Sequence, residues 1–138
     1  MAWECPNCTA QNESGIMCEQ CGYRMITGVR LTSAVGKTFE TRINFRIDRR
    51  IYKEIESDYQ YLSTTTGRYQ FELLKDETSE TGWSLRTSQH TDLYTLLNES
   101  VCEVNVLYPV YSGDIIKIGS KVNAGVTAAP LTVSFEGE

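Results

Sequence analysis

The sequence predicts a mainly β protein in which a small cysteine-rich module precedes an antiparallel β-sandwich. From Val29 onward, apolar and polar residues alternate with a period of two, which is typical of half-buried strands. Before that point, four of the five cysteines stand in two Cys-x-x-Cys pairs separated by nine residues. The composition changes near Thr27 and Gly28, so we expect two domains, residues 1–26 and residues 29–136.

The two cysteine pairs predict a metal site. Cys5 and Cys8 form the first pair and Cys18 and Cys21 the second, and this spacing lets four thiolates surround one zinc ion as a tetrahedron. All four positions would be taken by the protein, so none is open to water or a substrate and the expected zinc is structural. Residues 1–26 are too few to bury a core, so we expect metal binding and folding to be coupled. Gly22 suits the positive φ at which such a turn often ends.

The redox state of these cysteines has two alternatives. Two disulfides would need an oxidising compartment, whereas zinc binding needs reduced thiols. The first thirty residues lack the basic and then apolar pattern of a secretory signal. We therefore expect a cytoplasmic protein that binds one zinc ion.

The motifs of the first 25 residues resemble those of two families of zinc modules. CPxC, a polar loop and CxxCG resemble the short zinc ribbons at the N-terminus of many bacterial multidomain proteins. Trp3 and Asn12 are also similar to residues of the Ran-binding-protein type of finger. Ubiquitin-binding members of that second family carry Thr-Phe where this chain has Thr9 and Ala10, and the missing aromatic argues against ubiquitin binding.

Charge and hydropathy limit the kinds of partner. Nucleic-acid binding needs cations along a phosphate track, but the cysteine module has three glutamates against Arg24 and the chain has 13 basic and 18 acidic residues. No run of eighteen apolar residues is present, so no membrane span is expected. A protein partner remains the expected ligand.

Seven segments after Val29 are expected to be strands, because they are apolar or alternating and lie between turn-forming residues. They are residues 29–32, 42–48, 69–74, 83–87, 101–107, 115–118 and 131–135. The alternation places Phe45, Phe71 and Trp83 on the inward face, with Ile43 in the same phase as Phe45. Residues 50–58 and 92–99 are either short helices or loops, because neither has a clear apolar stripe. Short strands at this spacing favour a β-sandwich.

Four of these segments carry a further pattern: FRIDR at 45–49, TGRYQFELLKD at 66–76, WSLRTSQHTD at 83–92 and LYPVYSGDIIKIG at 107–119. In this order they resemble the motifs of the forkhead-associated domain, a β-sandwich that binds phosphothreonine peptides through loops at one end. The last segment matches the family's Leu, Gly-Asp and Ile-x-Ile-Gly pattern closely. The resemblance spans about residues 29–136 and implies a forkhead-associated-like antiparallel β-sandwich.

The resemblance also implies a phosphopeptide site. Asp48 replaces a glycine of the family motif, and Arg49 keeps the phosphate-gripping arginine. Arg68 keeps a second arginine, while Gly67 replaces the phosphate-binding serine. Of the remaining motif positions, one is kept and two are replaced. Ser88 is kept, Gln70 replaces a loop-bracing histidine, and His90-Thr91 replaces Asn-Gly. The implied phosphopeptide-binding residues are therefore Arg49, Arg68, Thr66, Gly67, Ser88 and His90.

The chemistry of such a site can be argued from the residues alone. A phosphothreonine carries close to two negative charges and three acceptor oxygens, so it needs arginine forks and hydroxyl or N–H donors. Residues 37–53 hold six basic residues against Glu40 and Asp48, and a hydroxyl from Thr64, Thr65 or Thr66 can replace the missing serine. Asp48 would oppose phosphate unless it turns away or pairs with Arg50.

Catalysis is not expected. In an enzyme, Cys102 would be the nucleophile and His90 its general base. However, Cys102 lies in a segment of alternating apolar residues, where cysteine is more often a small buried core residue. His90 lies in a polar loop. We therefore expect a non-enzymatic adaptor that docks a protein partner, either through phosphothreonine or without phosphate. In the second case the zinc ribbon or another surface would bind the partner.

Overall fold

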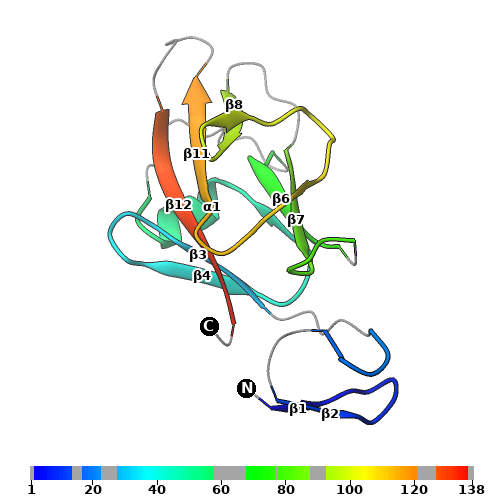
Figure 1. Ribbon diagram of the computed structural model, residues 1–138. Helices are drawn as coiled ribbons and strands as arrows, with labels where there is room; N and C mark the ends of the chain where they lie inside the picture. The colour runs from blue at the N-terminus through cyan, green and yellow to red at the C-terminus, as the bar shows by residue number, and fades with distance from the viewer. Residues whose placement is uncertain are drawn as a thin grey trace.

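The computed structural model describes residues 2–13, 17–22, 28–57, 68–76, 78–87, 93–120 and 127–136. Within these ranges the strands form a two-stranded, a four-stranded and a six-stranded sheet (Figure 1). All pairings between named strands are antiparallel. The mainly β, antiparallel class predicted from the sequence is confirmed.

The two-stranded sheet belongs to the cysteine-rich module. It is a hairpin of β1 (Trp3–Glu4) and β2 (Gln11–Asn12), in which Trp3 is paired with Asn12. The hairpin loop carries the first cysteine pair, while Cys18 and Cys21 follow β2. The hairpin therefore holds one cysteine pair and leads directly to the other.

The larger sheets form the sandwich. The six-stranded sheet has the order β4 (Thr38–Thr41), β3 (Val29–Thr32), β12 (Thr127–Phe135), β11 (Ile115–Ser120), β8 (Leu93–Leu97) and β9 (Ser100–Val101). The four-stranded sheet has the order β10 (Tyr108–Pro109), β7 (Trp83–Thr87), β6 (Phe71–Lys75) and β5 (Phe45–Ile47). Helix α1 (Arg49–Glu54) follows β5.

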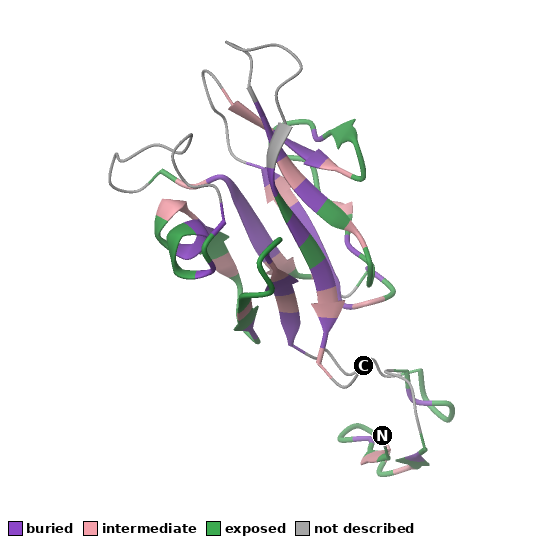
Figure 2. Ribbon diagram, turned by 90° about the vertical axis from the view of Figure 1, so that its left-hand side faces the viewer, coloured by how far each residue is buried: buried purple, intermediate pink, exposed green. Residues whose placement is uncertain are grey.

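The core lies between the two sheets. Phe71 and Trp83 are fully buried and Phe45 is partly buried, with its ring 5.0 Å from that of Phe39. Figure 2 shows buried and less buried residues along the strands of the sandwich, the pattern expected when one face of each sheet is covered. The strand phase predicted for Phe71 and Trp83 is confirmed. Ile43, by contrast, is 63% exposed because β5 starts only at Phe45.

Several predicted segments differ from the structure in type or in extent. Residues 92–99 were expected to be a helix or a loop, but β8 covers most of them as an inner strand that pairs with β11 and β9. Residues 101–107 were expected to be one strand, yet β9 ends at Val101 and only an isolated bridge forms at Val104. The chain crosses here from the six-stranded to the four-stranded sheet, so it cannot continue one ladder. The helix considered for 50–58 is present as α1, over fewer residues.

Strand β12 begins earlier than its predicted start at Leu131 because a β-bulge accommodates Pro130. The pairing with β11 shifts between Ile116 and Ile118, which face Leu131 and Ala128. Ala129 has a φ of 55° within this bulge. Proline cannot donate to a regular ladder, and bulges are where strands tolerate it.

The two ends of the sandwich differ in what they carry. Ile47 pairs with Phe71, which pairs with Thr87. Residues 48–49 and 68–70 therefore lie next to this end of the sheet, called here the loop end. Val29 pairs with Thr41 and with Phe135 at the opposite end, called here the linker end. The chain therefore passes from the cysteine-rich module into the sandwich at the end that lies away from the loop end (Figure 1).

Candidate functional site

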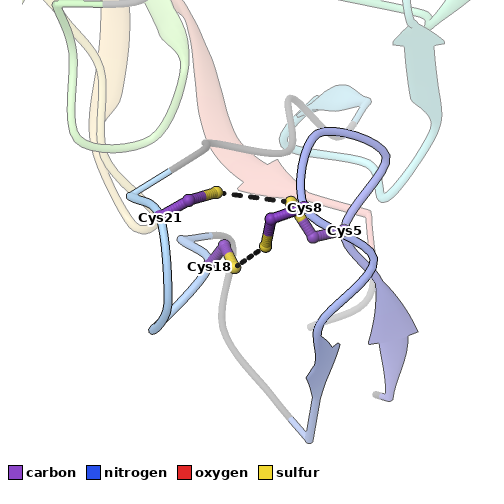
Figure 3. A group of neighbouring side chains, drawn as sticks. All are labelled: Cys5, Cys8, Cys18 and Cys21. Carbon is purple, nitrogen blue, oxygen red and sulfur yellow. Dashed lines mark hydrogen bonds between the residues drawn. The ribbon is translucent and has the colours of Figure 1, made fainter.

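The four cysteines of the N-terminal module meet at one point. Their sulfur atoms all lie within 4.8 Å of one another, and the closest cross-pair distances are 3.6 Å for Cys5 to Cys21 and 3.5 Å for Cys8 to Cys18 (Figure 3). Four sulfurs that each stand about 2.3 Å from a central zinc ion are about 3.8 Å apart, whereas a disulfide would bring two sulfurs to about 2 Å. The geometry fits a metal site of four thiolates, and all five cysteines are free of disulfides.

Each cysteine pair sits on the same kind of turn. The backbone N–H of Thr9 donates to the carbonyl of Cys5 at 2.8 Å, and that of Gly22 donates to the carbonyl of Cys18 at 2.9 Å. Thr9 and Gly22, the residues that follow each pair, have φ angles of 65° and 78°. Gly22 thus adopts the positive φ expected from the sequence. Thr9 adopts the same conformation although a side chain disfavours it, and the turn offsets that cost.

Two asparagines support the cysteine cluster. Buried Asn12 accepts a hydrogen bond from the Glu19 N–H at 3.0 Å, which ties β2 to the second cysteine pair. Asn7 donates to the sulfur of Cys21 at 3.5 Å from the first pair. A bond of this kind stabilises a thiolate ligand from outside the ligand set. In the sequence, Asn12 stands out only through a family resemblance, and no pattern points to Asn7.

The electrostatics of the cluster favour a cation. A hydrogen bond from the backbone of Cys21 is the main cause that lowers the pKa of the Cys18 thiol to about 6. A backbone hydrogen bond at Ala10 lowers the pKa of Cys8, but burial and the three neighbouring sulfurs outweigh it and raise that pKa to about 12. Four crowded thiols cannot all ionise together unless a positive charge lies among them.

The loop end of the sandwich carries the two arginines of the predicted phosphopeptide site. Arg49 is the first residue of α1 and is half-buried, while Arg68 is exposed and lies three residues before β6. Because Ile47 pairs with Phe71, both arginines belong to the same end of the sheet. Thr66, Gly67, Ser88 and His90, together with Thr64 and Thr65, lie outside the described residues.

Asp48 is the N-cap of α1. Its carboxylate accepts hydrogen bonds from the backbone N–H groups of Arg50 at 3.1 Å and Ile51 at 3.3 Å. Such a cap satisfies donors that the first turn of a helix leaves unpaired. The Asp48 carboxylate, which was expected to repel a bound phosphate, therefore binds the backbone amides of its own helix.

Gln70 anchors the loop end from inside the sandwich. The side-chain amide nitrogen of Gln70 donates to the Thr95 hydroxyl at 2.9 Å, and its backbone carbonyl accepts from the Thr87 hydroxyl at 3.1 Å. The hydroxyls of Thr87 and Thr95 are 2.9 Å apart, and all three residues are buried. Since Thr95 lies on the opposite sheet, this network joins the two sheets beside the loops. Gln70, which replaces the loop-bracing histidine of the family, thus braces this end of the sandwich through amide and hydroxyl hydrogen bonds.

Cys102 is not an activated thiol. It is 5% exposed, and burial raises its pKa to about 11, so it is protonated at neutral pH. A nucleophilic cysteine needs a lowered pKa. His90, the base considered for it, lies outside the described residues.

Comparison with known proteins identifies the fold. No protein-family model matches the chain, and no curated protein matches it. The chain is similar to the solution structure of the FHA domain of an Arabidopsis thaliana hypothetical protein, with a TM-score of 0.59 and 17% sequence identity. The match covers 92% of this chain and 95% of that one. The sandwich thus has a forkhead-associated-like fold, as the sequence motifs predicted.

No helix in the described ranges has the length and hydropathy needed to cross a membrane.

Proposed function

We propose that this chain is a non-enzymatic adaptor, with a zinc ribbon over residues 1–26 and a phosphothreonine-binding sandwich over residues 29–136. The forkhead-associated-like fold supports a role in protein interaction. The observation that carries the phosphate assignment is the pairing of Ile47 with Phe71, which brings Arg49 and Arg68 to one end of the sheet. Two guanidinium groups at one end supply the charge-assisted donors that a phosphate requires.

Two further observations support this function. The Asp48 carboxylate is turned to the α1 amides and accepts their hydrogen bonds. The buried network of Gln70, Thr87 and Thr95 holds the strand ends from which the loops start. A rigid support of this kind lowers the entropy lost when a peptide binds.

Zinc completes the proposal as a structural ion. Cys5, Cys8, Cys18 and Cys21 would hold it, with Asn7 as a hydrogen-bond donor to Cys21. Thiolate ligands suit zinc, and four of them close its coordination shell. The ion would stabilise the ribbon and would not act on a substrate.

The test of phosphate binding is selection from a phosphothreonine peptide library, followed by measurement of Kd for a selected peptide and its unphosphorylated form. We expect binding only of the phosphorylated peptide, and Arg49→Ala should weaken it by about tenfold or more, equivalent to about 1.4 kcal/mol. Binding should also weaken as salt rises.

Arg30→Ala is the matched control. Arg30 lies on β3 in the other sheet and pairs with Glu40 at 3.3 Å, so its loss should leave the affinity unchanged. Arg86 is less suitable because it contacts the buried Glu72. Equal affinity for the phosphorylated and unphosphorylated peptides would mean that the module binds its partner without phosphate.

A further inference from the structure

The outer face of the four-stranded sheet holds a cluster in which one buried carboxylate fixes two arginines. Glu72 on β6 is 5% exposed, and it faces Arg46 on β5 and Arg86 on β7. Its two oxygens are divided between them: Arg46 Nε donates to one at 3.1 Å, while Arg86 donates to the other from Nε at 3.1 Å and Nη2 at 2.7 Å. Burial raises the pKa of Glu72, but hydrogen bonds from Arg86, Tyr69 and Arg46 outweigh it, so the carboxyl is ionised at neutral pH.

Arg46 is held in place although its side chain is 66% exposed. Its guanidinium carbon lies 4.7 Å from the centre of the Tyr69 ring, in a cation–π contact, while Nε is bound to Glu72. Within the described part of the chain, its two terminal nitrogens have no hydrogen-bond partner. A guanidinium group fixed by its edge and its face, with its fork open to solvent, is arranged to receive another planar anion.

The charge of the cluster is not balanced. Two guanidinium groups share one carboxylate, which leaves these three residues with a net positive charge in a chain whose formal charge is −5. A pair that served stability alone needs only one arginine, as Arg30 and Glu40 illustrate on the other sheet.

From this arrangement we propose that the outer face of the four-stranded sheet, at Arg46 and Arg86, is a docking site for an acidic segment of a protein partner. A carboxylate of that segment binds the open fork of Arg46, and Arg86 contributes a second positive charge beside it. The complementary charges orient the acidic segment and raise its rate of association, in addition to contributing to affinity. Because the guanidinium groups are already positioned by Glu72 and Tyr69, little side-chain entropy is lost on binding.

An acidic protein segment fits this face better than a nucleic acid does. A nucleic acid is bound through a track of many cations, whereas this cluster offers two arginines around a carboxylate. The proposal does not depend on phosphothreonine binding, because the cluster lies on the sheet face and uses neither Arg49 nor the loops.

A peptide titration tests this site directly. A hexaglutamate peptide, with hexaglutamine as control, is added to the full chain at low salt while the side-chain Nε resonances of the arginines are followed by NMR. We expect saturable shifts of Arg46 and Arg86 with hexaglutamate alone. Arg46→Gln should weaken binding by about tenfold, in the range expected when a fixed charge contact is lost.

Two further variants separate binding from stability. Arg46→Lys keeps the charge but loses the fork and the ring contact, so it should restore binding only in part. Arg30→Gln removes a half-buried arginine from a one-to-one pair on the other sheet and should leave binding unchanged. The melting temperature of each variant is measured alongside, to verify that the sandwich is folded.

Several results would overturn the proposal. They are the absence of saturable shifts, equal shifts with hexaglutamine, and shifts confined to Arg49 and Arg68, which would place the acidic peptide at the loops. A folded Arg46→Gln variant of lower melting temperature but unchanged peptide affinity would show that the cluster only stabilises the sheet.

Discussion

At the scale of single residues, two departures from the family motifs acquire structural roles. Asp48 stands where a glycine is expected, and it caps α1 through the N–H groups of Arg50 and Ile51. Gln70 stands where a histidine is expected, and it links the two sheets through Thr95. A residue that departs from a family motif can therefore still stabilise the local structure, because it supplies hydrogen bonds to neighbouring polar groups.

The metal site gives the prediction that belongs to this scale. Zinc analysis of the full chain should find one zinc ion per chain, and Cys18→Ser should lose it. Binding of a structural zinc ion contributes on the order of 10 kcal/mol to folding of such modules, so the cysteine-rich module of the variant should unfold. The sandwich should keep its melting temperature, because its core residues lie outside residues 1–26.

Cys102→Ser is the control for this variant, since Cys102 is buried in the sandwich core and is outside the cysteine cluster. It should retain the full zinc content. A Cys18→Ser protein that keeps all its zinc, or a wild-type protein that binds two ions, would contradict the assignment.

At the scale of elements, the burial of β6 gives a stability prediction. Phe71 is fully buried and lies in the core between the sheets. Replacing it by alanine removes its apolar contacts and leaves a cavity, so Phe71→Ala should lower the free energy of unfolding by about 3–5 kcal/mol. Denaturant unfolding of the variant measures this value.

Ile43→Ala serves as the comparison for Phe71→Ala. Ile43 is 63% exposed and precedes β5, so its replacement should change the free energy of unfolding by less than about 0.5 kcal/mol. A loss at Ile43 as large as that at Phe71 would contradict the strand boundaries described here.

The elements also show how far the sequence alone could predict the fold. Strands with clear alternation, such as 83–87, were predicted with correct bounds because one face of each is covered by the core. Strand β8 was missed because its run LYTLL carries no clear period of two, and β12 was shortened because Pro130 hides a bulge. Such features depend on partners far along the chain, which a local pattern does not contain.

The candidate sites differ in the same way. The cysteine cluster could be predicted from spacing, since both pairs are local turns. The Arg46, Glu72 and Arg86 cluster could not, because it arises from the register of three strands. Only the three-dimensional structure brings these side chains to one face of the sheet.

At the scale of the whole molecule, the candidate phosphate site is well separated from the point where the chain enters the sandwich. Gly28 donates to the Glu136 carboxylate at 3.2 Å, and Arg42 pairs with the same carboxylate at the linker end. The loop end with Arg49 and Arg68 lies at the other end of β5 and β6. A partner held at the loop end would therefore not have to displace the segment that enters the sandwich.

The most direct test of this account is to map where a phosphothreonine peptide binds. Backbone amide shifts of the zinc-loaded full chain are recorded during titration with a library-selected phosphopeptide and with its unphosphorylated form. We expect shifts specific to the phosphorylated peptide at Arg49, Arg68 and Gln70, and none at Gly28 or Glu136. Shifts concentrated at the linker end, or no shifts with the phosphorylated peptide, would contradict the assignment of the loop end as a phosphate site.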